Sequence, residues 1–168
     1  LVSSSAASDV YKRQLEYPAV WSWSPRGRRL AVHRLNVLRI LSPGSEAAPV
    51  EARIPQGRTF FFAWSGDGER VALSWGANLS ILDARAGTAI REIPMRWGRP
   101  VALNADGSTV AIAIEPGIRL FDVATGVEAE PIVAETLERI AWHPEGSRIA
   151  ATSRSAFRIW DVERKHPV

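Results

Sequence analysis

A short turn motif recurs four times along this chain at a nearly constant spacing. Each copy begins with a tryptophan or a leucine and ends with a glycine. The four copies are Trp23–Gly27, Trp64–Gly68, Leu103–Gly107 and Trp142–Gly146. Successive glycines are 41, 39 and 39 residues apart. A fixed period of this length predicts that the chain folds as a series of similar units, each built from one repeat.

A second motif follows each turn and keeps the same spacing. It ends with a short polar residue, which is Ser in the first copy and Asp in the others. The four copies are Arg39–Ser42, Ser80–Asp83, Arg119–Asp122 and Arg158–Asp161. Such side chains accept hydrogen bonds from the backbone of the turn that follows them. We therefore interpret these residues as turn formers rather than as catalytic groups.

The second repeat shows the pattern of its strands clearly. Aromatic and β-branched runs alternate with short segments rich in Gly, Asn, Asp and Pro, which is typical of strands joined by turns. The predicted strands are Phe60–Trp64, Val71–Trp75, Leu79–Asp83 and Ala89–Ile93. No stretch of the chain has apolar residues at helical spacing over three turns, so we expect no helix. The fold class is therefore all-β, with four antiparallel strands per repeat.

At these motifs the chain resembles the WD-repeat β-propeller family. The best match is Phe157–Val162, followed by Leu120–Gly126, and the resemblance extends from Leu15 to Val162. It implies that each repeat is one four-stranded blade of a β-propeller. Rings in this family usually contain more blades, so we expect a fragment of about four blades whose ring is not closed by this chain alone. We place blade 1 at 15–56, blade 2 at 57–97, blade 3 at 98–136, blade 4, without its outer strand, at 137–162, and a tail at 163–168.

The chain departs from the family pattern where side-chain hydrogen bonds usually connect the blades. No repeat opens with Gly-His, and Pro55, Pro94 and Val133 stand near that position. Ala77 and Ser155 stand where a loop Asp is common in the family. We therefore expect apolar packing to hold neighbouring blades together.

Three tryptophans recur at one position of the repeat. They are Trp23, Trp64 and Trp142, and Leu103 fills the same position in the third repeat. A bulky apolar residue in every copy predicts a core position, and Trp160 on a third strand is predicted to lie in the core as well.

The first residues differ in character from the repeats. Ser4–Gln14 resembles the in-frame translation of a common transposase sequencing adapter, with a match at all eleven residues. We expect residues 1–14 to be non-native and disordered, native sequence to begin near Leu15, and the blades to belong to a larger propeller.

Exposed blade edges favour association between copies of the chain. Arginine outnumbers lysine by 19 to 2, which suggests a GC-rich bacterial genome of metagenomic origin.

Composition and motifs give no sign of catalysis, nucleic-acid binding or a membrane span. The net charge of +3 is too small to predict nucleic-acid binding, and no apolar run is long enough to cross a bilayer.

The three histidines, His33, His143 and His166, lack the spacing of metal ligands, so we expect no metal or cofactor. His143 occupies a turn position, and we interpret it as a turn residue. Neither a Gly-x-Ser-x-Gly elbow nor a phosphate-binding loop is present. The absence of cysteine fits a reducing compartment, and we expect the cytoplasm.

The resemblance also implies where a partner would bind. In the family, the loops after the second and fourth strands share one face, which commonly binds partners. Here these loops contain Arg58, Trp75, Arg96, Trp97 and Arg99. Arg and Trp are enriched among the residues that dominate binding energy, so these five form the candidate face for a protein or peptide. The alternative is a solvated loop with one tryptophan folded back over the core.

The expected function is a non-catalytic scaffold for protein–protein interaction. Two alternatives stay open. One is a propeller that belongs to a hydrolase, and the other is a secreted or periplasmic binding propeller.

Overall fold

The computed structural model describes residues 20–34, 36–54 and 60–168, and fifteen β-strands lie in this part of the chain. Blade 1 contains β1 (Val20–Trp23), β2 (Leu30–Arg34), β3 (Val37–Leu41) and β4 (Val50–Arg53). Blade 2 contains β5 (Phe60–Trp64), β6 (Arg70–Trp75), β7 (Asn78–Asp83) and β8 (Ala89–Pro94). Blade 3 contains β9 (Val101–Leu103), β10 (Thr109–Ala113), β11 (Gly117–Asp122) and β12 (Glu128–Val133). Blade 4 contains β13 (Arg139–Trp142), β14 (Arg148–Thr152) and β15 (Phe157–Asp161).

Each blade is an antiparallel sheet in which every strand pairs with the strand that follows it in the chain. In blade 2, for example, Leu73 lies opposite Phe62 on β5 and opposite Ser80 on β7. The described residues contain no helix. The all-β prediction of four antiparallel blades, with three strands in the last, is therefore confirmed. The blade boundaries placed from the sequence stay a prediction, and the segment 1–14 lies outside the described residues.

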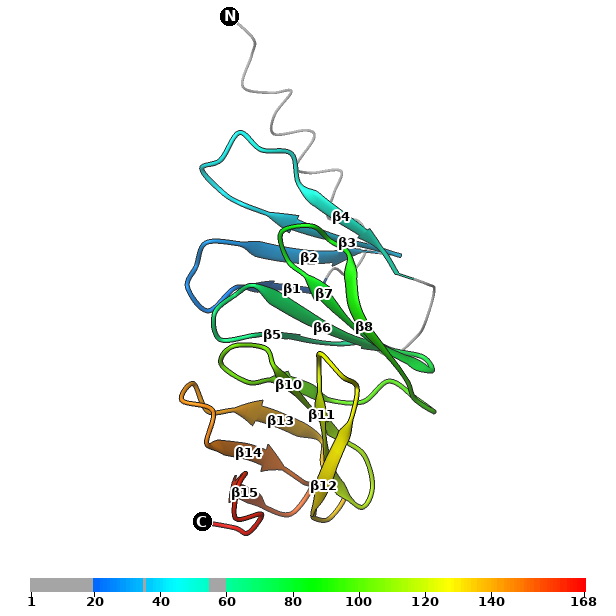
Figure 1. The fold of residues 1–168 in the computed structure, drawn as a ribbon, viewed down its shortest axis with the longest axis vertical. Helices are drawn as coiled ribbons and strands as arrows, with labels where there is room; N and C mark the ends of the chain where they lie inside the picture. Colours follow the sequence, from blue (N-terminus) through cyan, green and yellow to red (C-terminus); the bar gives the residue numbers. More distant parts are fainter. Residues whose placement is uncertain (1–19, 35, 55–59) are drawn as a thin grey trace, which may run out of the picture.

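Blades 1 and 2 follow one another along the long axis of the molecule, and blades 3 and 4 lie side by side at its other end (Figure 1). Blade 1 lies at one end of the stack, and blade 4 lies at the opposite end with the C-terminus. The described blades therefore do not close into a ring.

Neighbouring blades are held together by apolar clusters. Successive side chains of a strand point to opposite faces of its sheet, so a middle blade is covered on both faces. On β6, Val71 and Leu73 pack against Leu38 and Ile40 of blade 1, whereas Ala72 packs in the cluster shared with blade 3. We call the face toward the preceding blade the leading face and the face toward the following blade the trailing face. The expectation that apolar packing joins the blades is confirmed.

Arginine adds a hydrogen bond across two of these boundaries. Arg29, two residues after the turn glycine of blade 1, donates from Nη1 to the Gly68 carbonyl of blade 2 at 2.7 Å. Arg70 occupies the same repeat position in blade 2 and donates to the Gly107 carbonyl of blade 3, also at 2.7 Å. A hydrogen bond from a charged donor contributes about 1.5–3 kcal/mol. These bonds therefore tie the turn of blade 1 to that of blade 2, and the turn of blade 2 to that of blade 3.

The boundary between blades 3 and 4 lacks this arginine. Thr109 stands at the corresponding position, and its side chain is too short to cross the boundary. The Gly146 carbonyl instead accepts a hydrogen bond from Nε1 of Trp142 in the same blade, at 2.8 Å.

The prediction that the recurring tryptophan position lies in the core is correct only in part. Leu103 and Trp160 are buried, and Trp64 and Trp142 are half-buried at their blade boundaries. Trp23 is 47% exposed, so the prediction is wrong for this residue. The reason is that no blade of the described chain covers the leading face of blade 1.

The last residues, 163–168, continue the pattern of the repeat beyond β15. The backbone N–H of Asp161 donates to the His166 carbonyl at 3.1 Å, and an isolated bridge pairs Trp160 with Pro167. The chain thus turns back along β15, on the path that the fourth strand follows in the other blades.

Candidate functional site

The structure separates the residues that the sequence places on a partner-binding face. Arg58 lies outside the described residues. Trp75 is the last residue of β6 and is only 6% exposed, because it continues the buried alternation of Val71 and Leu73 on the leading face of blade 2. Trp75 is therefore a core residue, and the prediction that it belongs to an exposed face needs correction.

The other three predicted residues stay together between β8 and β9. Trp97 is 69% exposed, Arg96 is exposed and Arg99 is half-buried. We call residues 95–99 the Trp97 loop. Here the indole is not folded back over the core, in contrast to the alternative drawn from the sequence.

Hydrogen bonds fix both ends of the Trp97 loop. The Met95 N–H donates to the Ala77 carbonyl at 2.8 Å. The Arg99 N–H donates to Oγ of Ser74 at 2.8 Å, and Ser74 is fully buried. Trp97 is therefore displayed between two anchored residues, so its backbone has little freedom to lose when a ligand binds.

The hydrogen bond between Met95 and Ala77 has an equivalent in blade 1 and in blade 3. Each of these bonds joins the loop after a fourth strand to the loop between the second and third strands of the same blade. The equivalent bonds run from Ile54 to Asn36 in blade 1, at 2.8 Å, and from Ala134 to Pro116 in blade 3, at 3.3 Å. The two kinds of loop therefore lie side by side in each of these blades.

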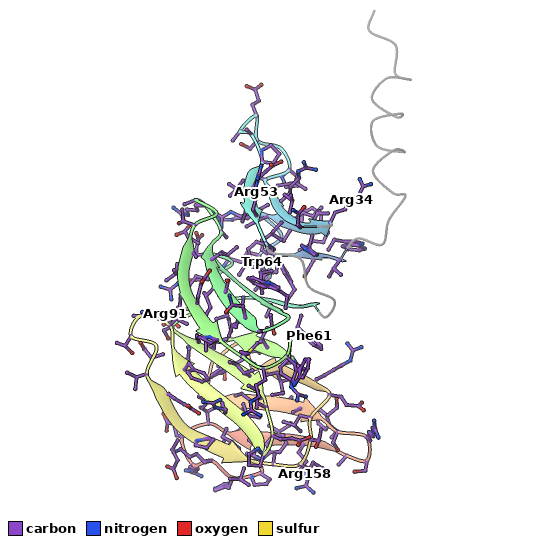
Figure 2. The ribbon with its side chains drawn as sticks, turned by 90° about the vertical axis from the view of Figure 1, so that its right-hand side faces the viewer. Arg34, Arg53, Phe61, Trp64, Arg91 and Arg158 are labelled. Atoms are coloured by element: carbon purple, nitrogen blue, oxygen red, sulfur yellow. The ribbon has the colours of Figure 1, made fainter. Side chains whose placement is uncertain are left out.

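A hollow of about 590 Å³ opens among the inner strands of blades 2, 3 and 4. Its walls include Phe61, Val101 and Phe157, together with Glu138 and Arg139. Figure 2 labels Phe61 where the green strands of blade 2 meet the later blades. Sequence reasoning missed this hollow because its walls come from three repeats that meet only when the blades stack.

The acidic turn residues bind backbone groups, as we interpret them from the sequence. Oδ1 of Asp122 accepts hydrogen bonds from the N–H and the hydroxyl of Thr125, both at 2.7 Å. Asp161 accepts from the N–H of Arg164 at 2.8 Å. These bonds lower the pKa of both carboxyl groups below their ordinary value. His143 accepts the Glu145 N–H through Nδ1 at 3.2 Å, so it is a turn residue.

Two further kinds of site are absent from the described residues. In that part of the chain no three His, Asp or Glu side chains converge in a way that could hold a metal ion. Residues 20–34, 36–54 and 60–168 also contain no helix with the length and apolar character needed to cross a bilayer.

Neither a protein-family model nor a curated protein matches the sequence. Solved structures do match the fold. The β-propeller domain of Cps50 (Swd1) from Myceliophteria thermophila superposes with a TM-score of 0.70 at 18% identity, covering 89% of this chain and 56% of that one. Hydrazine synthase from Kuenenia stuttgartiensis superposes with a TM-score of 0.68 at 15% identity, covering 88% of this chain and 47% of that one. The chain therefore has a β-propeller fold and spans about half the length of these two chains.

Proposed function

We propose that this chain is a non-catalytic β-propeller module of the WD-repeat kind that binds a protein or peptide through the Trp97 loop. The observation that carries the proposal is the largely exposed indole of Trp97 on a loop whose two ends are anchored. A large aromatic side chain presented in one place is typical of the residues that dominate binding energy. The use of Asp122 and Asp161 as turn residues supports a non-catalytic role.

The charges beside Trp97 indicate the chemistry of the partner. Arg96 and Arg99 lie on either side of the indole in the chain, and neither guanidinium makes a hydrogen bond or an ion pair with the rest of the described chain. Both groups are thus available to carboxylates, which bind guanidinium well. The preferred ligand is a segment with an apolar side chain next to acidic residues.

A display library of random peptides tests this proposal. We expect the protein to retain peptides with Asp or Glu beside an apolar residue. Trp97→Ala should weaken the selected peptides more than about tenfold, the loss expected for a binding hot spot. Arg96→Ala with Arg99→Ala should weaken them as well, and more strongly at low salt.

Arg164→Ala is the matched control, because Arg164 is an exposed arginine in a turn of blade 4. It should leave peptide binding unchanged. Peptides that bind Trp97→Ala as tightly as the unchanged protein would exclude the Trp97 loop as the site. Loss of the far-ultraviolet circular dichroism signal in Trp97→Ala would show instead that Trp97 is structural.

A further inference from the structure

The two ends of the blade stack carry the two halves of an interface that is repeated inside the chain. At each internal boundary, the trailing face of one blade packs on the leading face of the next. Among the described residues, no blade covers the trailing face of blade 4 or the leading face of blade 1. Blades 1 and 4 lie at opposite ends of the molecule (Figure 1). A single copy of the described chain therefore cannot bring them together.

The trailing face of blade 4 repeats apolar positions that are buried in the other blades. One position on the third strand is filled by Leu38, Leu79 and Ile118, all fully buried. Phe157 fills it in blade 4 and is 64% exposed. Ile159, two residues further along β15, is only half-buried. Phe157 and Ile159 thus place exposed or half-buried apolar side chains where the other blades make their inter-blade contacts.

The leading face of blade 1 shows the complementary pattern. Phe62 and Trp64 on the first strand of blade 2 pack against blade 1. Trp21 and Trp23 stand at the same two repeat positions on β1. They are among the most exposed large apolar side chains of the described chain, with Trp21 at 66%. Neighbouring exposed aromatic side chains of this kind are typical of an interaction surface.

Arg148 stands where it can add a hydrogen bond to the apolar contact between these two faces. It stands two residues after the turn glycine of blade 4, the position from which Arg29 and Arg70 reach the turn glycine of the following blade. Its side chain is exposed and makes no hydrogen bond or ion pair within the described chain. The corresponding acceptor in a following blade 1 is the carbonyl of Gly27.

We propose that copies of this chain assemble head to tail, with the trailing face of blade 4 in one copy packed on the leading face of blade 1 in the next. Arg148 then donates to the Gly27 carbonyl, and Phe157 and Trp21 become buried. The hollow of about 590 Å³ beside Phe157 leaves room for the bulky side chains of the second copy. The contact is heterologous, so it closes into a ring when the rotation between copies fits and otherwise extends into a filament.

The assembly does not depend on peptide binding at the Trp97 loop, and the two proposals can fail separately.

Sedimentation velocity over a range of concentrations tests the assembly. The unchanged protein should form a dimer or a larger species as its concentration rises. Phe157→Asp places a charge on the trailing face of blade 4, and Trp21→Asp places one on the leading face of blade 1. Each variant alone should remain a monomer. An equimolar mixture should form a dimer, because it retains one intact trailing face and one intact leading face.

Arg158→Asp is the control for Phe157→Asp. Arg158 is the next residue of β15, its side chain belongs to the opposite face of the strand, and it lies at the blade 4 end of the stack (Figure 2). This variant should assemble normally. Arg148→Ala should raise the dissociation constant about tenfold or more, as expected for losing a charged hydrogen bond.

Three results would overturn the proposal. The first is an unchanged protein that stays monomeric at every concentration. The second is association that survives both Phe157→Asp and Trp21→Asp. The third is a mixture of these two variants that remains monomeric although each gives the circular dichroism spectrum of the unchanged protein.

Discussion

Replacing Gly107 by alanine should destabilise the protein more than the same change at Gly146. Both glycines have positive φ angles, 71° and 83°, and this region costs alanine roughly 1–2 kcal/mol. A Cβ added at Gly146 would meet nothing within 4 Å, so only the backbone cost applies there. A Cβ at Gly107 would lie 2.7 Å from Cδ of Arg70, on the preceding blade.

The side chain of Arg70 cannot move aside without loss. Its Nη1 donates to the Gly107 carbonyl at 2.7 Å, so the new methyl group either compresses the arginine stem or breaks this bond. Compression of a packed contact costs about 1–3 kcal/mol, and loss of a charged hydrogen bond costs about 1.5–3 kcal/mol. We therefore expect Gly107→Ala to cost about 2–5 kcal/mol, against about 1–2 kcal/mol for Gly146→Ala.

Urea unfolding followed by circular dichroism, at one low protein concentration, measures both changes. Arg70→Ala combined with Gly107→Ala completes the experiment, since removal of the arginine should bring the cost of Gly107→Ala close to that of Gly146→Ala. Equal costs for the two glycines, within about 0.5 kcal/mol, would refute the inter-blade origin of the difference. A difference that persists undiminished in the Arg70→Ala background would refute the role of Arg70, because the remaining close contact of the added Cβ is Cβ of Ser65 at 3.2 Å.

Two further predictions concern the boundary between blades 3 and 4 and the response to acid. Thr109→Arg should supply the missing bond to the Gly146 carbonyl and stabilise the protein by about 1 kcal/mol, seen as a higher urea midpoint; an unchanged or lower midpoint would contradict this. Acid should destabilise the protein, because hydrogen bonds lower the pKa of Asp122 and Asp161 in the folded state. Their stabilising contribution is present above the ordinary aspartate pKa of 3.8 and is lost as the pH falls through the lower folded value. Thermal midpoints between neutral pH and about pH 3 should show this loss, and Asp122→Asn should reduce it; equal slopes for the two proteins would count against the role of Asp122.

The blades could be predicted from the sequence because their signals are local. Turn glycines, strand-ending aspartates and alternating apolar residues act within a few positions of each other. For this reason the strand predicted at Phe60–Trp64 agrees with β5 residue for residue, and the one predicted at Val71–Trp75 differs from β6 by a single residue.

Exposure could not be predicted in the same way, because it depends on which blades are neighbours. Trp23 and Trp64 occupy the same repeat position, yet only Trp64 has a preceding blade to pack against in the described chain. For Trp75 a signal was present: it lies two residues beyond Leu73, on the same face of the strand. The acceptor of Arg70 is a backbone carbonyl, which the sequence does not distinguish from any other.

The pairing of strands only with their successors has a consequence for how the chain folds. Each strand pairs with a strand that is close to it in the sequence, so the entropy lost in closing each loop is small. Chains dominated by contacts that are local in sequence fold faster than sheets woven from distant strands. During synthesis, β1–β4 can form a sheet before β13 exists. Each later blade then docks on a surface that is already in place.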